Sequence, residues 1–177
     1  MLLVENSPAT ILIAALAAAS QGVYPPDLTD WSLWNSRMPN DGDQAIAIYD
    51  TGSKPDGRSH RSGRTVEHPS LQIRIRSADY PVAFQKALSL CSFLDSLSNL
   101  SVEILDEAGE STGNFALIQS ATRYGGIISL GNEEDGKRQI LTINTRLTLA
   151  EALHSPSSQT PFNFFDWPFA GYFTWTG

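Results

Sequence analysis

The feature that most constrains the fold is a strict alternation of apolar and polar residues from Leu71 to Arg76. Three aliphatic side chains fill every second position, and a glutamine and two arginines fill the positions between them. Because successive side chains of an extended strand point to opposite faces, this pattern predicts a strand with one packed face and one charged face. The chain is therefore expected to build a sheet that is covered on one side.

Two helices are expected to cover that sheet. Ser7 and Pro8 have the residue types of an N-cap and a first helical position, and strong helix formers continue until Gly22. A second helix is expected from Asp79, as its cap, to about Leu97. Its predicted buried stripe consists of Phe84, Leu88, Cys91 and Leu94.

Several further strands are expected. The segment 44–50 alternates, 101–105 and 115–122 suggest a hairpin, and 138–149 reads as a long strand. Turn signals at 124–126 and 132–136 bracket a short strand at 127–130. The predicted fold is α+β, with a mixed, mostly antiparallel sheet of five or six strands and two main helices packed on one face.

A chain of 177 residues with 41% hydrophobic content is long enough for one domain with a substantial core. We expect a single domain over 1–153, which contains a long surface loop at 51–67 rich in glycine and basic residues. After His154 a spacer rich in serine and proline leads into an extended arm with eight aromatic residues in 161–177. Residues 154–177 are called the aromatic arm below.

The residue inventory argues against several kinds of chemistry. A formal net charge of −7 disfavours a nucleic-acid binder that relies on phosphate neutralisation. The single cysteine, Cys91, lies in an apolar stretch and is expected to fill core space. His60, His68 and His154 stand in separate contexts without metal-ligand spacing. We predict no catalytic residue, no cofactor and no metal, although carboxylates brought together by the fold stay an open alternative.

The apolar stretch from Ile11 to Ala19 does not predict a membrane segment. It is about half of the ~20 residues that a spanning helix requires. No lysine or arginine precedes it, as a signal peptide would need. We expect a soluble protein, made in the cytoplasm of the cell that produces it.

The aromatic arm and the basic positions are the candidate contact residues. Eight aromatic side chains are unfavourable in water and are expected to be buried against another surface. The spacer is long enough for the arm to contact another molecule, where aromatic side chains make good anchors. Arg74 and Arg76 belong either to an ordinary solvated face, or to a face that lines a ring lumen or meets a neighbouring subunit. The candidate interface residues are Arg58, Arg61, Arg64, Arg74, Arg76, Phe162, Phe164, Phe165, Trp167, Phe169, Tyr172, Phe173 and Trp175.

Two stretches resemble a phage family variously described as minor capsid or tail-terminator proteins. The first is EHPSLQIRIR at 67–76, followed by Asp79 and Tyr80 and a helix that contains Ala83, Ala87 and Leu94. The second is IISLGNEEDGKR at 127–138, which leads into LTINTRL at 141–147. The order of the expected elements over 8–150 is also similar. The loop at 51–67 and the aromatic arm depart from the usual pattern.

The resemblance implies a small α+β subunit of the virion, assembled in the host cytoplasm. Such subunits form a sixfold ring that caps the tail tube and joins it to the head connector, and the family has no catalytic residues. The implied partners are further copies of the chain, the head connector or its portal-side adaptor, and the tail-tube protein. DNA would pass through the lumen without specific binding, and no membrane is involved.

Other classes of function stay open at this stage. A short-tailed phage could use such a subunit as a head-tail adaptor or minor capsid protein. A monomeric ligand- or peptide-binding module could form a pocket from Trp31, Trp34 and the aromatic arm. These hypotheses differ first in their predicted mass, because the ring requires several copies and the binding module requires one.

Overall fold

The computed structural model describes residues 6–28, 30–58, 65–133 and 136–150. Within them, six strands form one sheet in the order β1-β2-β3-β6-β5-β4. β1 pairs with β2 in parallel, and the other neighbours pair antiparallel. The elements are α1 (Pro8–Ala18), β1 (Ser32–Asn35), β2 (Ala45–Arg58), β3 (Thr65–Ser77), α2 (Tyr80–Ser96), β4 (Ser98–Leu105), β5 (Ser111–Asn132) and β6 (Gln139–Ala150).

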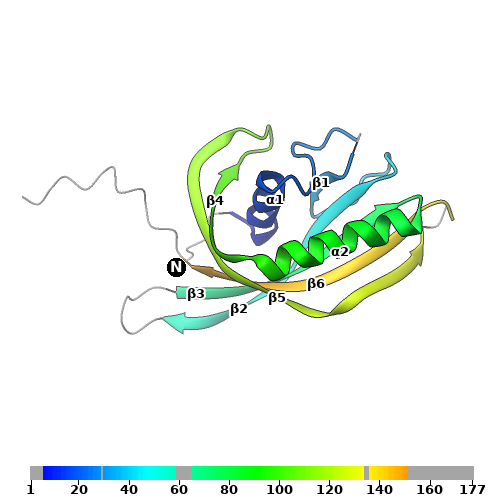
Figure 1. The fold of residues 1–177 in the computed structure, drawn as a ribbon. Coiled ribbons are helices and arrows are strands. Elements are labelled where there is room, and N and C mark those ends of the chain that lie inside the picture. Colours follow the sequence, from blue (N-terminus) through cyan, green and yellow to red (C-terminus); the bar gives the residue numbers. More distant parts are fainter. Residues whose placement is uncertain (1–5, 29, 59–64, 134–135, 151–177) are drawn as a thin grey trace, which may run out of the picture.

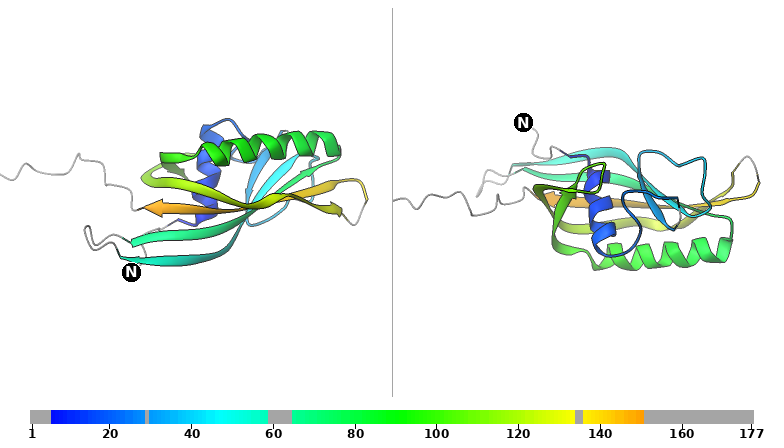
Figure 2. Two further views of the ribbon diagram at one scale, coloured as in Figure 1. Left: turned by 60° about the horizontal axis from the view of Figure 1, so that its bottom comes forward. Right: turned by 90° about the horizontal axis from the view of Figure 1, so that it is seen from above.

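Both helices cover the same face of the curled sheet, with α2 along the strands and α1 across them (Figures 1 and 2). The two helices and the inward side chains of the strands form one apolar cluster. Its centre includes Ile73 and Ile75 of β3 and Ile143 of β6, all at most 1% exposed. The predicted fold class, an α+β sheet covered by two helices on one side, is confirmed for the described residues.

The first helix begins as its sequence predicts. The Ser7 side chain accepts a hydrogen bond from the Thr10 backbone N–H at 3.2 Å, and Pro8 stands in the first turn. The backbone N–H of Ala9 donates to Asp50 Oδ1 at 3.0 Å, which ties this end to β2. Apolar residues lie all around α1 because β4 and the strands β1 to β3 contact it from several sides.

The second helix has the predicted bounds but buries a different stripe. Its buried residues are Ala83, Ala87, Leu90, Cys91 and Leu94. The expected stripe is therefore wrong at Leu88, which is 42% exposed, and at Phe84, which is only partly buried. Small alanine side chains on the inner face suit a close approach of α2 to the sheet. Asp79 stands at the N-cap position, as expected, but its side chain makes no capping hydrogen bond.

The predicted loop at 51–67 is for the most part a β-hairpin. β2 continues to Arg58 and β3 begins at Thr65, with Pro55 opposite Glu67 and Arg58 opposite Thr65. β3 is in turn paired with β6 as far as Val66 opposite Ala150. The backbone here is held in extended form by its neighbours, although its glycines and proline have low strand propensity. Residues 59–64 lie outside the described residues.

β5 is longer than its sequence suggests. The turn expected at 124–126 is instead an irregularity within one continuous strand, since the pairing with β6 shifts register between Tyr124 and Ile128. Gly125 has φ of 73°, a conformation that favours glycine at such a bulge. The turn expected after Asn132 is present, and Gly136 N–H donates to the Glu133 carbonyl at 2.8 Å.

Candidate assembly surfaces

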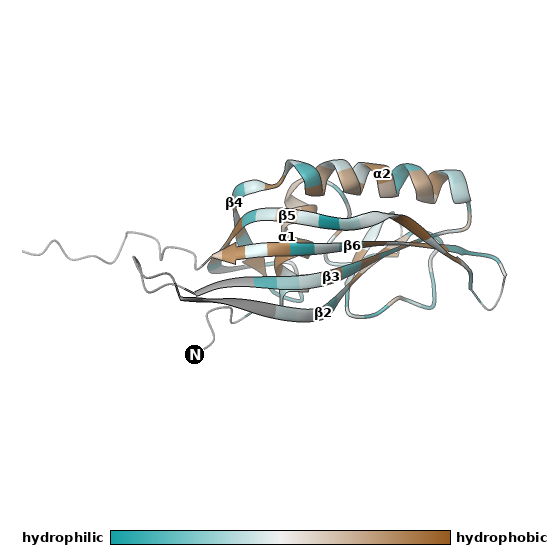
Figure 3. Ribbon diagram, turned by 90° about the horizontal axis from the view of Figure 1, so that it is seen from below, coloured by the Kyte–Doolittle hydropathy of each residue, from teal (hydrophilic) through white to brown (hydrophobic). Residues whose placement is uncertain are grey.

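The face of the sheet opposite the helices is called the open face below, and Figure 3, a view from below, shows hydrophilic residues within β3 and β6. Tyr49, Gln72, Asn144 and Tyr124 form one row across four neighbouring strands. Gln72 Nε2 donates to Asn144 Oδ1 at 3.3 Å, and Gln72 Oε1 accepts from Arg74 Nε at 2.8 Å. The open face is therefore a connected polar surface.

Three arginines stack on aromatic rings on or beside this face. Arg74 lies 4.8 Å from the centroid of the Tyr49 ring, and Arg146 lies 4.8 Å from that of Tyr124. Trp34, on the same face through its pairing with Ala47, has the Arg37 guanidinium 4.9 Å from its centroid. Among the described residues, no carboxylate forms an ion pair with any of the three. Stacking holds each positive charge in place and leaves it unneutralised.

Arg76, two residues further along β3, has a different environment. It was expected on an exposed charged face, but it is 1% exposed, so that expectation is wrong. Its guanidinium donates to the Asp41 and Gly42 carbonyls at 2.8 and 2.7 Å and to the Pro39 carbonyl, and it pairs with Glu133 at 3.2 Å.

Arg138, the residue before β6, holds the same loop through Asp43 at 3.4 Å and the Asn40 carbonyl at 2.8 Å. A buried guanidinium requires such partners. Arg76 therefore fixes the loop at 39–43 within its own chain.

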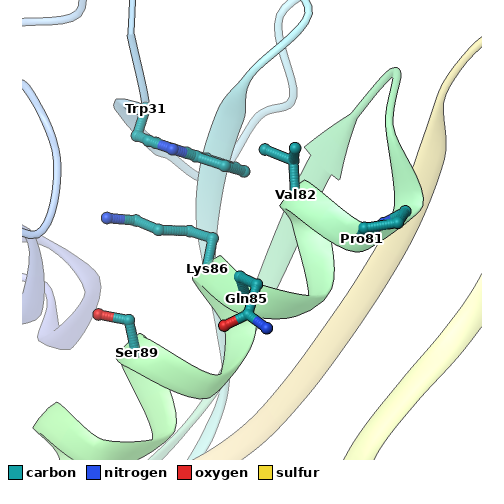
Figure 4. A pocket seen from close by; sticks show the side chains of 6 residues that line it. All are labelled: Trp31, Pro81, Val82, Gln85, Lys86 and Ser89. Carbon is teal, nitrogen blue, oxygen red and sulfur yellow. The ribbon is translucent and has the colours of Figure 1, made fainter.

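The outer surface of α2 is largely uncharged. Tyr80, Val82 and Leu88 are each exposed by 36% or more. Beside them lies a hollow of about 410 Å³ lined by Trp31, Pro81, Val82, Gln85, Lys86 and Ser89 (Figure 4). Lys86 Nζ lies 5.6 Å from the Trp31 ring centroid, and burial lowers the pKa of this lysine. Trp34 does not line this hollow, and the aromatic arm, the third part of the expected pocket, lies outside the described residues.

A further exposed apolar surface follows the last half of β5. β4 pairs with β5 only between Ser111 and Ser120. Over 121–132, β5 has β6 on one side and no described strand on the other. Tyr124, Ile128 and Leu130 are 40%, 45% and 51% exposed here. This segment, 121–132, is called the free edge below.

An ion pair joins this strand to the helix above it. Arg123 donates to both carboxylate oxygens of Asp95 at 2.7 and 2.6 Å, and these hydrogen bonds lower the pKa of Asp95. Cys91 is buried nearby, and burial raises the pKa of its thiol. A shielded thiol of this kind is a poor nucleophile, as expected for a core residue.

The structure separates the candidate interface residues that the sequence singled out. Arg74 is half-buried on the open face, Arg76 is enclosed, and Arg58 ends β2. Arg61, Arg64 and the eight aromatic residues of the arm lie outside the described residues. Sequence reasoning missed Tyr49, Tyr124 and Arg146. The alternation of β6 could have indicated Arg146, but the tyrosines become partners only through strand register.

The described residues contain no group of three or more side chains arranged to bind a metal ion. Among the same residues, no helix is long and apolar enough to cross a membrane. The described residues present three exposed surfaces: a cationic sheet face, a largely uncharged helix face and a free strand edge.

The sequence model of a family described as "Bacteriophage tail terminator protein" matches residues 15–109, more than half of the chain. The chain belongs to this family. The match runs from within α1 to the turn after β4, so this tail terminator protein carries β5 and β6 beyond the matched region. It is a structural protein of the phage tail and is located in the virion, as predicted.

No curated protein matches this tail terminator protein. Among solved structures, a chain from "Virion of native gene transfer agent (GTA) particle" is similar with a TM-score of 0.43 and 8% identity. The alignment covers 78% of this chain and 84% of that chain. At this TM-score the likeness adds nothing to the family assignment.

Proposed function

We propose that six copies of this chain form a ring that caps the tail tube and joins it to the head connector. The family match over residues 15–109 is the observation that carries the proposal. The partners are then further copies of the chain, the tail-tube protein, and the head connector or its portal-side adaptor.

Two exposed apolar surfaces support an assembling subunit. Leu88 on α2, and Ile128 and Leu130 on the free edge, each expose more than 40% of their area. Clusters of exposed apolar residues are typical of surfaces that are buried in an assembly. Because these surfaces lie on different elements, they suit head-to-tail contacts, which close into a ring when the rotation permits.

The open face lines the lumen in this proposal. Arg74 and Arg146 present positive charge that no described carboxylate neutralises. Such charges attract phosphate without reading base sequence. The net charge of −7 on the whole chain limits that attraction, so that DNA passes without being retained.

The remaining candidate contacts are assigned to other subunits. Arg58, Arg61 and Arg64 are proposed to contact an adjoining ring, where opposite charges help to set the register between unlike rings. The aromatic residues of the arm are proposed as anchors on a neighbouring copy.

The mass of the purified protein in solution tests this function. Light scattering on the full-length chain should give a sixfold mass, and a chain truncated before Pro156 should give a smaller one. If both forms stay strictly monomeric at high concentration, the ring proposal fails and a neck adaptor or a binding module becomes the better hypothesis.

A further inference from the structure

The free edge is a long row of unpaired backbone groups. Ser98 opposite Ser120 is the last pair between β4 and β5, whereas β5 continues to Asn132 opposite Gln139. At about 3.3 Å per residue, the free edge measures about 40 Å. Backbone N–H and C=O groups on its outer side can bind another extended segment.

The free edge has no residues of the kinds that usually block pairing at a sheet edge, although two register shifts interrupt its pairing with β6. Residues 121–132 contain no proline, lysine, aspartate or glutamate. Arg123, the one charged residue in this segment, is held by Asp95. By contrast, the outer edge of β2 beyond its contact with β1 contains Pro55, which has no N–H to offer. Proteins normally block a long exposed apolar edge. An edge without blocking residues therefore indicates that a partner segment covers it.

We propose that the aromatic arm of a neighbouring copy pairs with the free edge as an additional strand. This inference rests on the proposed function, which brings copies side by side. The free edge is then the acceptor site of the arm.

The composition of the arm suits this role. Residues 169–175 read FAGYFTW, in which Phe169, Phe173 and Trp175 fall on one side of an extended strand and Tyr172 on the other. Aromatic residues are enriched in β-strands, and their side chains make favourable contacts with side chains on the neighbouring strand. Residues 169–177 can lie along the twelve-residue free edge. None of their side chains is charged, so none opposes burial beside Ile128 and Leu130.

The direction of β6 favours a neighbour over the same chain. β6 enters the sheet with Gln139 beside Asn132 and ends with Ala150 beside Leu117. The chain therefore leaves the sheet while it runs away from its own free edge, and β4 stands beside β5 at that end (Figure 1). The ten residues 151–160 can span up to about 33 Å when fully extended.

Hydrogen exchange on the assembled full-length protein tests the site directly. Amides on the outer side of the free edge should exchange at least tenfold more slowly in the full-length chain than in the chain truncated before Pro156. Amides of 111–120 belong to the part of β5 already paired with β4, so their exchange rates should be the same in both chains. Rings that form with equal exchange at 121–132 in both chains would overturn the edge assignment and leave the ring proposal standing.

A matched pair of substitutions on the same strand sharpens this test. Ile128→Lys places a charge on the free edge, and Phe115→Lys places one at a similarly exposed position that β4 already flanks. Only Ile128→Lys should abolish the arm-dependent protection. If it keeps full protection, the arm binds elsewhere.

A cysteine pair distinguishes a neighbour's arm from the chain's own. Ile128→Cys and Phe173→Cys, carried on separate molecules and mixed before oxidation, should give disulfide-linked dimers. Cys91 is buried and serves as the internal control. A double variant that gives only an internally linked monomer would overturn the proposal in favour of the arm folding back.

Discussion

The two faces of the sheet hold the molecule together in different ways. On the covered face, Ile73 and Ile75 pack under the helices with no exposed area. On the open face of the same strand, Arg74 stacks on a tyrosine and Arg76 binds loop carbonyls. Apolar burial is non-directional and tolerates many partners, whereas a guanidinium needs hydrogen-bond acceptors at set positions. The covered face thus sets the fold, and the open face depends on register and on loops.

The covered face should show the largest effect on stability. Leu90→Ala removes a fully buried side chain of α2 and should lower the free energy of unfolding by about 3 to 4 kcal/mol. Leu88→Ala, two residues away but 42% exposed, should cost less than about 0.5 kcal/mol. Urea unfolding measures both, and equal costs would contradict the observed inner stripe.

Arg76→Ala should have the next largest effect, about 3 kcal/mol, because it leaves loop carbonyls and Glu133 without their buried partner. Arg74→Ala on the same face should cost less than about 1 kcal/mol. Thermal unfolding compares the two variants. A larger loss of stability for Arg74→Ala than for Arg76→Ala would contradict the assignment of Arg76 as the enclosed arginine and Arg74 as the surface arginine.

A smaller effect is expected from the stack of Arg74 on Tyr49. A double-mutant cycle with Arg74→Ala and Tyr49→Ala should give a coupling of about 0.5 to 1 kcal/mol. The cycle of Tyr49→Ala with Arg37→Ala serves as the control, because Arg37 stacks on Trp34 instead. Equal coupling in both cycles would mean that the contact itself contributes nothing.

The smallest effect concerns the exposed pair that links α2 to β5. Arg123 lowers the folded-state pKa of Asp95, so the pair contributes stability above the ordinary carboxyl pKa of about 3.9 and loses it as pH falls through the lower folded value. Asp95→Asn should therefore lower the melting temperature slightly at pH 5 to 7, and the difference should vanish near pH 2.5. Asp79→Asn, whose parent carboxylate caps no helix N–H, is the control. A difference that persists unchanged at pH 2.5 would rule out this pair as its cause.

Part of this fold follows from local pattern. Ser7 and Pro8 begin α1 as expected, and the alternation of Leu71 to Arg76 lies within β3. Leu141, Ile143 and Leu147 stand at alternate positions of β6, and all three are buried. In each case the residues that define the sequence pattern also make the hydrogen bond or the core contact. Residues close together in the sequence are therefore sufficient to predict these features.

Other features could not be predicted because distant residues decide them. The segment 51–58 has turn composition, yet β3 holds it as a strand. Gly125 and Gly126 suggest a turn, but pairing with β6 on either side carries β5 through them. On α2, both possible stripes have helical spacing, and only the shape of the sheet selects the one with Ala83 and Ala87.

The sequence by itself determined the α+β class, the two helices, the sheet with one packed face and the resemblance to the tail-terminator family. The tertiary structure decided that Arg76 is enclosed while Arg74 stays at the surface, and that 121–132 is a free edge. The physical reason is the distance along the sequence over which each interaction acts. Helix capping and alternation act between residues a few positions apart, whereas burial of a charge and pairing of an edge depend on which distant segments arrive beside them.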